Sequence, residues 1–229
     1  MTDADSVWNV GATSQNNPQC LKCEYAPANY SIAQQFNASF EYQLPISHWQ
    51  ALSSLPRRLT DGWKFLGIPG KATGSPFSIY GPYGSLQYGE GGPQRPFFIK
   101  RATLAQGAYS GGTQFFSNDV IGNNNGIGTG FFGLPLVTSP VNQDQVLPSP
   151  GNLGRNTYTS PGWWGLDCSV IKDTRITESK VVQFRAEFFS IFNNVNMWGP
   201  NSGLGSPGFG VATGASGNRV IQLGLRLTF

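Results

Sequence analysis

The last eleven residues of the chain, 219–229, read RVIQLGLRLTF and indicate its fold. From Ile221 onward every second side chain is apolar, and the side chains between them are polar or small. An alternation with a period of two is typical of a β-strand whose two faces meet different surroundings. About eleven residues are also what a tilted strand needs to cross the roughly 30 Å of hydrocarbon in a bilayer. The stretch therefore predicts a strand that spans a membrane.

Four other stretches carry strand patterns. Residues 34–44 and 180–192 alternate over most of their length, and residues 163–173 alternate except at Ile171. Residues 62–79 are interrupted by prolines and glycines, which indicates an irregular or bulged strand. The sequence thus predicts about five strands. The apolar face of the two most regular ones would carry Phe36, Ala38, Phe40, Tyr42, Leu44, Val182, Phe184, Ala186 and Phe188.

The connections between these strands are of two kinds. Residues 174–179 form a short polar turn, whereas residues 193–218 and 81–160 are long and rich in glycine and asparagine. A structureless span of that length is uncommon in a compact soluble domain, while membrane barrels combine short periplasmic turns with long extracellular loops. We therefore divide the chain into an extracellular loop or N-terminal tail (1–33), a first barrel hairpin (34–80), a long extracellular loop (81–160) and three C-terminal barrel strands (161–229).

The composition limits the classes of function. The 229 residues include 30 Gly and 16 Pro, which disfavours long helices, and 12% charged residues is about half the share usual in a soluble domain. Fifteen basic and 12 acidic residues give a net charge of +3, which offers little support for a nucleic-acid partner. No segment approaches the roughly 18 consecutive apolar residues of a membrane-spanning helix. With one histidine, three cysteines and no nucleophile beside a base, we predict a non-enzymatic protein without a cofactor.

These patterns together predict an all-β fold: an antiparallel up-and-down transmembrane β-barrel segment of about five strands, open as a fragment, with long extracellular loops. Closure in lipid removes the unpaired edges that an open sheet would expose. A soluble β-sandwich also alternates, but its outward face should carry Lys and Glu, and here both faces are nearly free of Lys. The barrel is therefore favoured, and a secreted β-sandwich binding module is the alternative.

Several motifs in the C-terminal third point to a known family. They are GNLGRNT (151–157), PGWW (161–164), VQFRAEFFSIFN (182–193) and QLGLRLTF (222–229). Together they resemble the C-terminal barrel of Oar-like TonB-dependent outer-membrane receptors. The resemblance is specific over residues 151–229, looser over residues 30–80 and poor over residues 81–150.

This resemblance implies a large barrel in the outer membrane of a Gram-negative-type bacterium, plugged by an N-terminal domain and driven by TonB to import bulky nutrients. The chain would be a passive segment of the barrel wall, and its partners would be outer-membrane lipid, the barrel-assembly machinery that reads a terminal aromatic such as Phe229, and TonB through an N-terminal part. Five strands fall short of the eight in the smallest bacterial barrels. We therefore expect the chain to be the C-terminal piece of a longer receptor. An adhesion or surface-binding barrel without transport is the alternative.

Cys20 and Cys23 stand three positions apart and leave alternatives open. They could form a disulfide that pins an extracellular loop, remain idle thiols, or supply half of a metal site. A redox motif requires a helix N-terminus after the first cysteine to lower the pKa of its thiol, and residues 24–27 (EYAP) do not supply one. The disulfide is the favoured interpretation. Cys168 falls on the apolar face of its strand, where we expect it to act as a small hydrophobic residue.

Other motifs favour structural roles. Residues 203–208 (GLGSPG) fit the dinucleotide fingerprint G-x-G-x-x-G, but Pro207 and the lack of a following helical pattern favour a plain loop. His48 lies in the turn after Pro45, and we expect an exposed or interfacial imidazole. A group of aromatic side chains is expected in the belt at the membrane interface, with ligand stacking as the alternative. These are Trp163, Trp164, Phe192 and Trp198.

The charges of the C-terminal strands predict a register. Opposite charges that face each other across two strands stabilise the pair, and like charges destabilise it. We therefore expect Asp167 opposite Arg185, and Glu187 opposite Arg226. The four side chains would form a ladder of alternating charge that lines the lumen and has a structural role only.

The direction of the strands follows from the same pattern. If Phe229 ends at the periplasm, the turn at 174–179 is periplasmic and the loop at 193–218 is extracellular. The turn at 45–61, which joins the first two strands, is then periplasmic as well. Residues 81–160 are expected to contain no full membrane crossing.

Overall fold

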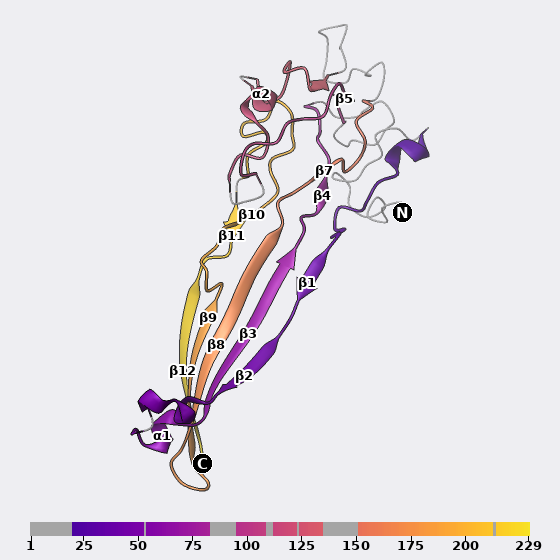
Figure 1. The fold of residues 1–229 in the computed structure, drawn as a ribbon. Coiled ribbons are helices and arrows are strands. Elements are labelled where there is room, and N and C mark those ends of the chain that lie inside the picture. The colour runs from indigo at the N-terminus through magenta and orange to yellow at the C-terminus, as the bar shows by residue number, and fades with distance from the viewer. Residues whose placement is uncertain are drawn as a thin grey trace. The chain divides into compact units, whose positions relative to one another are not determined.

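A computed structural model describes most of the chain (Figure 1), namely residues 20–52, 54–82, 95–108, 112–122, 124–134, 151–212 and 214–229. The chain divides into two compact units. The first, called the loop unit here, comprises Met1–Gln34, Thr73–Gly162 and Met197–Ala215. The second, called the sheet unit, comprises Gln35–Ala72, Trp163–Asn196 and Ser216–Phe229.

The sheet unit is a single antiparallel sheet (Figure 1). Its strand order is β1-β3-β8-β9-β12, and β2 pairs with β3 beside β1. Among the described residues, β12 pairs with β9 alone, so the sheet is open at this edge and does not close. The all-β, antiparallel architecture predicted from the alternation is therefore confirmed. The strands are β1 (Gln35–Asn37), β2 (Phe40–Leu44), β3 (Trp63–Ala72), β8 (Trp163–Arg175), β9 (Val181–Phe189) and β12 (Val220–Thr228).

The first predicted strand is present in two pieces because of a proline in its neighbour. Asn37 of β1 pairs with Gly70 and Phe40 of β2 pairs with Gly67, which is one continuous register. Between these pairs the Ala38 N–H donates to the Pro69 carbonyl oxygen at 3.2 Å. The nitrogen of Pro69 faces the same side as this carbonyl but carries no hydrogen to donate. One backbone hydrogen bond between the two strands is therefore absent, and the strand is divided at this point. Pro69 and Gly70 do not interrupt β3, contrary to expectation, whereas the predicted stretch 62–79 does break at residues 73–75, between β3 and the next strand.

The registers put all apolar rows of the sheet on one face. Phe65 of β3 pairs with Val170 of β8, which pairs with Ala186 of β9, which in turn pairs with Leu223 of β12. Because side chains alternate along each strand, the rows on either side repeat this arrangement. The apolar face of β12 is exposed in the isolated unit: Ile221, Leu223, Leu225 and Leu227.

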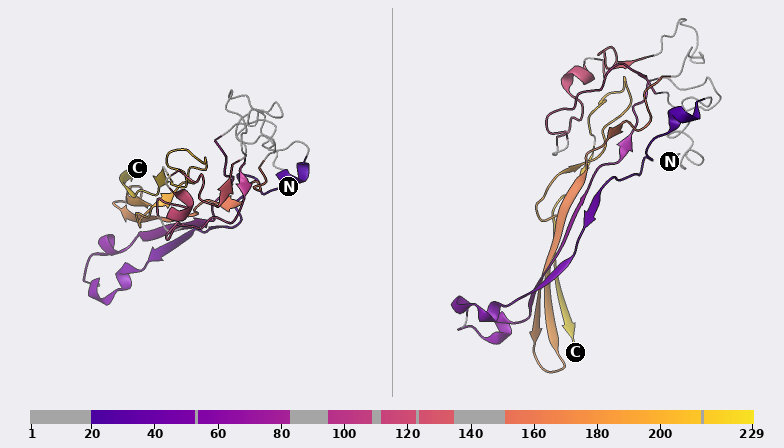
Figure 2. Two further views of the ribbon diagram at one scale, coloured as in Figure 1. Left: turned by 90° about the horizontal axis from the view of Figure 1, so that it is seen from above. Right: turned by 45° about the vertical axis from the view of Figure 1, so that its right-hand side comes forward.

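One end of the sheet, called the turn end here, gathers the short connections. Here β8 turns into β9 through residues 176–180, and β12 reaches the C-terminus (Figure 2). The segment 45–62 between β2 and β3 lies at the same end and contains η3 (Ile46–His48), η4 (Gln50–Leu52) and α1 (Arg57–Thr60). None of the helices in the described part of the chain has the length and apolarity to span a membrane.

Gly62, which leads into β3, has φ +78°, and a Cβ placed on it would lie 2.3 Å from the Asp173 carbonyl oxygen. Replacing Gly62 with alanine is expected to destabilise the sheet unit by about 1 to 3 kcal/mol, because a left-handed backbone is strained for alanine and the methyl group meets β8. Urea unfolding of the protein in vesicles measures this. Gly165→Ala in β8 is the control, because its added Cβ has nothing within 4 Å. Equal effects of the two changes would contradict the prediction.

The loop unit packs around an aromatic cluster. The Phe116 ring lies 5.2 Å from the Tyr158 ring and 5.5 Å from the Phe209 ring, between centroids. Two-stranded pairings surround it: β4 (Pro76–Phe77) with β7 (Tyr158–Thr159), and β5 (Phe97–Phe98) with β6 (Phe132–Gly133). The remaining elements are η2 (Leu21–Glu24), α2 (Asn118–Ile121) and, between the two units along the chain, β10 (Asn196–Met197) with β11 (Ala215–Ser216). The described part of 81–160 contains no strand of membrane-crossing length.

Candidate functional site

The charge ladder predicted for the polar face does not form. Arg185 lies opposite Ile171, and Glu187 lies opposite Ser169 and Gln222. Asp167 and Arg185 are therefore not cross-strand neighbours, and Arg226 faces Gln183 instead of Glu187. All four charged residues keep to the polar face, but both predicted registers are wrong.

The turn between β8 and β9 explains the first error. The predicted register would leave residues 175–177 to make the turn, and a three-residue hairpin loop usually needs a left-handed residue, commonly glycine. Residues 174–180 contain no glycine, and none of them has a positive φ. The observed hairpin instead closes at Arg175 and Val181, and the Ile176 N–H donates to the Lys180 carbonyl oxygen at 2.9 Å. A wider turn shifts the register of the whole strand.

Three of the four charged residues of the predicted ladder have other partners. Arg185 binds Glu187 two positions along the same strand, with 2.8 Å between Nη2 and Oε1. The Asp167 carboxylate accepts a hydrogen bond from the Ser190 N–H at 2.8 Å. The connection into β12 is held by the Asn193 side chain, which accepts the Arg219 N–H at 3.0 Å. Asp167, Arg185 and Glu187 thus have partners other than those that the predicted registers gave them.

A different polar row crosses four strands near the turn end. Lys64 of β3 lies 4.0 Å from Glu41 of β2 and 3.6 Å from Asp173 of β8. The Gln183 side chain of β9 donates to the Asp173 carboxylate at 2.8 Å. Sequence reasoning missed this row because Lys64 lies in a strand whose proline and glycine residues obscured its alternation.

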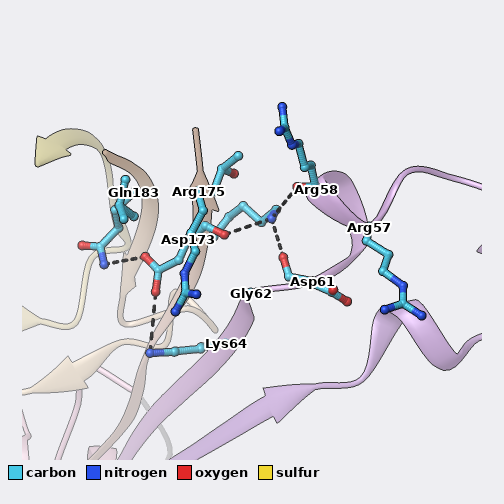
Figure 3. Close-up of a pocket in the computed structure, with 11 residues that line it drawn as sticks. Arg57, Arg58, Asp61, Gly62, Lys64, Asp173, Arg175 and Gln183 are labelled. Atoms are coloured by element: carbon cyan, nitrogen blue, oxygen red, sulfur yellow. Dashed lines mark hydrogen bonds and ion pairs between the residues drawn. The ribbon is translucent and has the colours of Figure 1, made fainter. Parts of the chain in front are cut away.

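The polar row borders a cavity at the turn end (Figure 3) with a volume of about 700 Å³. Five cationic side chains and two carboxylates are among the residues that line it. Asp173 is paired as described above, and the positive charges are therefore in excess. The cationic residues are Arg57, Arg58, Lys64, Lys172 and Arg175.

Lys172 fixes α1 to the sheet at this cavity. Its Nζ donates to the carbonyl oxygens of Arg58 (2.9 Å), Asp173 (3.1 Å) and Asp61. The Trp63 indole N–H also donates to the Leu59 carbonyl oxygen at 2.8 Å. Trp63 and Lys172 are cross-strand partners on the apolar face. Both α1 contacts therefore come from the row at which the apolar face of β3 ends.

A second cavity, of about 350 Å³, lies in the loop unit. Phe98, Leu153 and Tyr158 provide apolar surface, and Arg101 and Asn152 provide polar groups. The Tyr158 hydroxyl oxygen accepts the Ala102 N–H at 3.1 Å. Burial raises the pKa of the Tyr158 phenol, against the smaller opposite effects of the Ala102 N–H and the Arg101 charge.

This pKa shift predicts alkaline weakening of the loop unit. Because the folded state has the higher pKa, the stability linked to Tyr158 is fully present below the unfolded value of 10.0 and is lost as pH rises through the folded value. Protease cleavage within the loop unit is expected to accelerate above about pH 10. Tyr158→Phe should remove this component of the acceleration, and an unchanged pH profile in that variant would contradict the prediction.

The remaining predicted site residues lie as follows. Cys20 and Cys23 form a disulfide, and Cys168 is a buried free thiol. His48 is exposed in η3, and residues 203–208 form turns in a loop. No group of three His, Cys, Asp or Glu in the described part of the chain could hold a metal ion. The aromatic residues expected in the belt are all exposed: Trp163, Trp164, Phe192 and Trp198.

Sequence reasoning also missed a buried ion pair in the loop unit. The Arg95 guanidinium donates to both carboxylate oxygens of Glu24, at 2.8 and 2.7 Å, and its Nε donates to the Leu153 carbonyl oxygen at 2.8 Å. Glu24 directly follows the disulfide in the chain. The pair therefore ties the N-terminal segment to residues around Leu153.

Comparison with known proteins gave one family. A family model described as an outer membrane beta barrel domain matches residues 1–222, which includes the whole loop unit and the sheet unit as far as Gln222, the third residue of β12. Neither the curated proteins nor the solved structures gave a match. The family description agrees with the open sheet of strands that carry an apolar and a polar face.

Proposed function

The chain belongs to the outer membrane beta barrel domain family, and from this premise we propose that it forms part of the wall of a TonB-dependent receptor of the Oar-like type. The protein is located in the bacterial outer membrane. One observation carries the barrel-wall role: antiparallel strands up to 13 residues long present a continuous apolar face to one side. The motifs in residues 151–229 that resemble the Oar-like group support the finer assignment.

In this role the two faces of the sheet have different partners. The apolar rows on β8, β9 and β12 contact lipid, and the polar row around Lys64 and Asp173 faces the lumen. The barrel-assembly machinery would recognise Phe229 at the exposed C-terminus. TonB would act through an N-terminal part of the receptor. The wall segment is not an enzyme and uses no cofactor.

The lengths of the connections support one orientation. The turn at 176–180 is short, whereas residues 73–162 and 190–219 make long connections between strands. Long connections of bacterial barrels lie outside the cell and short ones lie in the periplasm. The turn end therefore faces the periplasm, and the loop unit belongs to the extracellular connections.

Transport is tested in cells that produce the natural protein. The protein should fractionate with outer membranes and shift its mobility on gels when heated. Growth on a panel of peptides, glycans and metal chelates should include at least one nutrient whose use requires both this protein and functional TonB. A nutrient phenotype that persists without TonB, or no phenotype across the panel, would contradict energised transport.

The loop unit supports a second candidate function. Its aromatic cluster and its own cavity of about 350 Å³ favour a surface-binding or adhesion barrel without transport. Under this alternative, deletion of the protein would reduce cell attachment to glycan or protein surfaces, and loss of TonB would have no effect on attachment. The two candidates are thus separated by their dependence on TonB.

A further inference from the structure

We infer that the segment 45–62 is an interfacial foot that binds anionic phospholipid headgroups in the leaflet at the turn end. The foot is defined here by its described residues, 45–52 and 54–62. This inference goes beyond the proposed transport role and rests only on the orientation proposed above, which sets the turn end at the periplasmic leaflet.

The foot exposes large apolar side chains. Trp49 is 50% exposed, Leu55 is 45% exposed and Leu59 is 59% exposed. A segment of a soluble surface gains nothing from such exposure, whereas apolar side chains of an interfacial helix bury themselves about 5 to 10 Å into the boundary between headgroups and acyl chains. Tryptophan is also enriched at this level of the membrane. The foot thus has the apolar half of an interfacial segment.

Basic side chains provide the polar half of this interfacial segment. Arg57 and Arg58 stand beside Leu59 on α1, and Arg175 lies across the turn-end cavity from them (Figure 3). None of these three guanidinium groups forms an ion pair within the described part of the chain. Basic side chains next to a membrane segment attract anionic lipids by about 1 kcal/mol each, and three of the five basic side chains that line the cavity are these arginines. Guanidinium groups also match phosphate geometry well.

The level of the foot relative to the membrane is set by the sheet. On β3 the apolar face ends at Trp63, which pairs with Lys172, and one further apolar row, that of Val182 on β9, follows toward the turn end. Tryptophan is typical of the boundary where the hydrocarbon meets the headgroups, and the buried Lys172 ammonium beside it is satisfied by carbonyl oxygens. Both residues hold α1 through hydrogen bonds to its carbonyl oxygens and those of Asp61. The foot is therefore held at the depth of the phosphate groups.

The cavity can accept a headgroup. A volume of about 700 Å³ is within the range of ligand-binding cavities in proteins. Asp173 is occupied by Lys64 and Gln183, and the Lys172 ammonium is occupied by carbonyl oxygens. The remaining charges of the cavity are three guanidinium groups against the Asp61 carboxylate. This excess of positive charge selects a phosphate-bearing lipid with a net negative charge over a zwitterionic one.

The test places a fluorescent probe on the foot. The natural protein is purified from outer membranes with Cys168→Ala and Leu55→Cys, labelled at residue 55 with a polarity-sensitive dye, and reconstituted in phosphatidylcholine with or without phosphatidylglycerol. With phosphatidylglycerol we expect blue-shifted emission and strong quenching by nitroxide lipids labelled at the headgroup. Arg57→Gln with Arg58→Gln should lower the ratio of docked to undocked foot about 25-fold, roughly five-fold for each charge. Labelling at Leu59→Cys repeats the measurement from a second position.

The control removes equal charge at the same end of the sheet. Lys180→Gln with Arg226→Gln, in the hairpin turn and on β12, should leave most of the docking intact. The inference is overturned if docking is the same with and without phosphatidylglycerol, if the control double variant lowers docking as much as the α1 double variant, or if inorganic phosphate without vesicles produces the same spectral shift. The heat-dependent gel shift of each variant reports on the barrel separately, so that a failed foot and a failed barrel are distinguishable.

Discussion

Replacing Glu24 with glutamine is expected to lower the free energy of unfolding of the loop unit by about 3 to 5 kcal/mol. Glu24 and Arg95 are 7% and 4% exposed, and two hydrogen bonds of 2.8 and 2.7 Å join them. Glutamine keeps the volume of the side chain but removes its charge, so that the buried guanidinium loses this carboxylate as its counter-charge. The cost exceeds that of a lost hydrogen bond because a buried charge cannot recover its solvation.

Hydrogen exchange measures this change. The amides near residues 95–98 and 151–153 should exchange faster in Glu24→Gln, because Arg95 also holds the Leu153 carbonyl oxygen. Glu41→Gln is the matched control: Glu41 is 51% exposed and lies 4.0 Å from Lys64, so the change should cost less than about 1 kcal/mol. Similar exchange in the two variants would contradict the energetic role assigned to the buried pair.

The alternation of side chains predicted the strands and their faces well. The stretches expected at 163–173, 180–192 and 219–229 are β8, β9 and β12, each displaced by a few residues at most at its ends. Alternation is a local property, because a membrane sets the chemistry of each face independently of the neighbouring strand. The open antiparallel sheet could therefore be predicted from the sequence before it was known which strands pair with each other.

The register did not follow from the sequence, because it depends on terms that compete. Pairing charges across β8 and β9 is worth roughly 0.2 to 1 kcal/mol for each pair. Arg185 and Glu187 recover such a contact within one strand, so cross-strand pairing brings no further gain. The glycine-free turn then decides the register, because a tight loop would force a residue into the left-handed region.

The loop unit escaped prediction for a different reason. Its contacts join distant residues: Arg95 lies 71 positions from Glu24, and the Asn156 side chain donates to the Asn29 side chain 127 positions away. Neither pair has a periodic signal, and the short strands β4 to β7 are too brief to produce one. The Gly-rich composition of 81–160 suggested a plain loop, whereas a few aromatic residues suffice to form a cluster there.

A charge placed on the apolar face of β12 should have the largest effect on the sheet unit. Leu223 lies near the middle of the strand, is 67% exposed and pairs with Ala186 in the apolar row. Leu223→Arg is expected to destabilise the folded protein in the membrane by about 2 to 4 kcal/mol, because arginine at the bilayer midplane cannot be hydrated without distorting the lipid. Less folded protein in outer membranes, and a lower urea midpoint for the heat-modifiable form, would report the loss.

The neighbouring position provides the control for this prediction. Gln222 points to the polar face and lies opposite Glu187, so Gln222→Arg adds the same side chain one residue away and gains a partner of opposite charge. Its effect should be near zero or slightly stabilising. Should Gln222→Arg prove the more damaging of the two, the lipid-facing and lumen-facing sides would be reversed, and both the foot at the headgroups and the lumen row around Lys64 would lose their basis. Equal tolerance of both variants would instead indicate that the exposed apolar face meets water, since only apolar surroundings discriminate so strongly between adjacent positions.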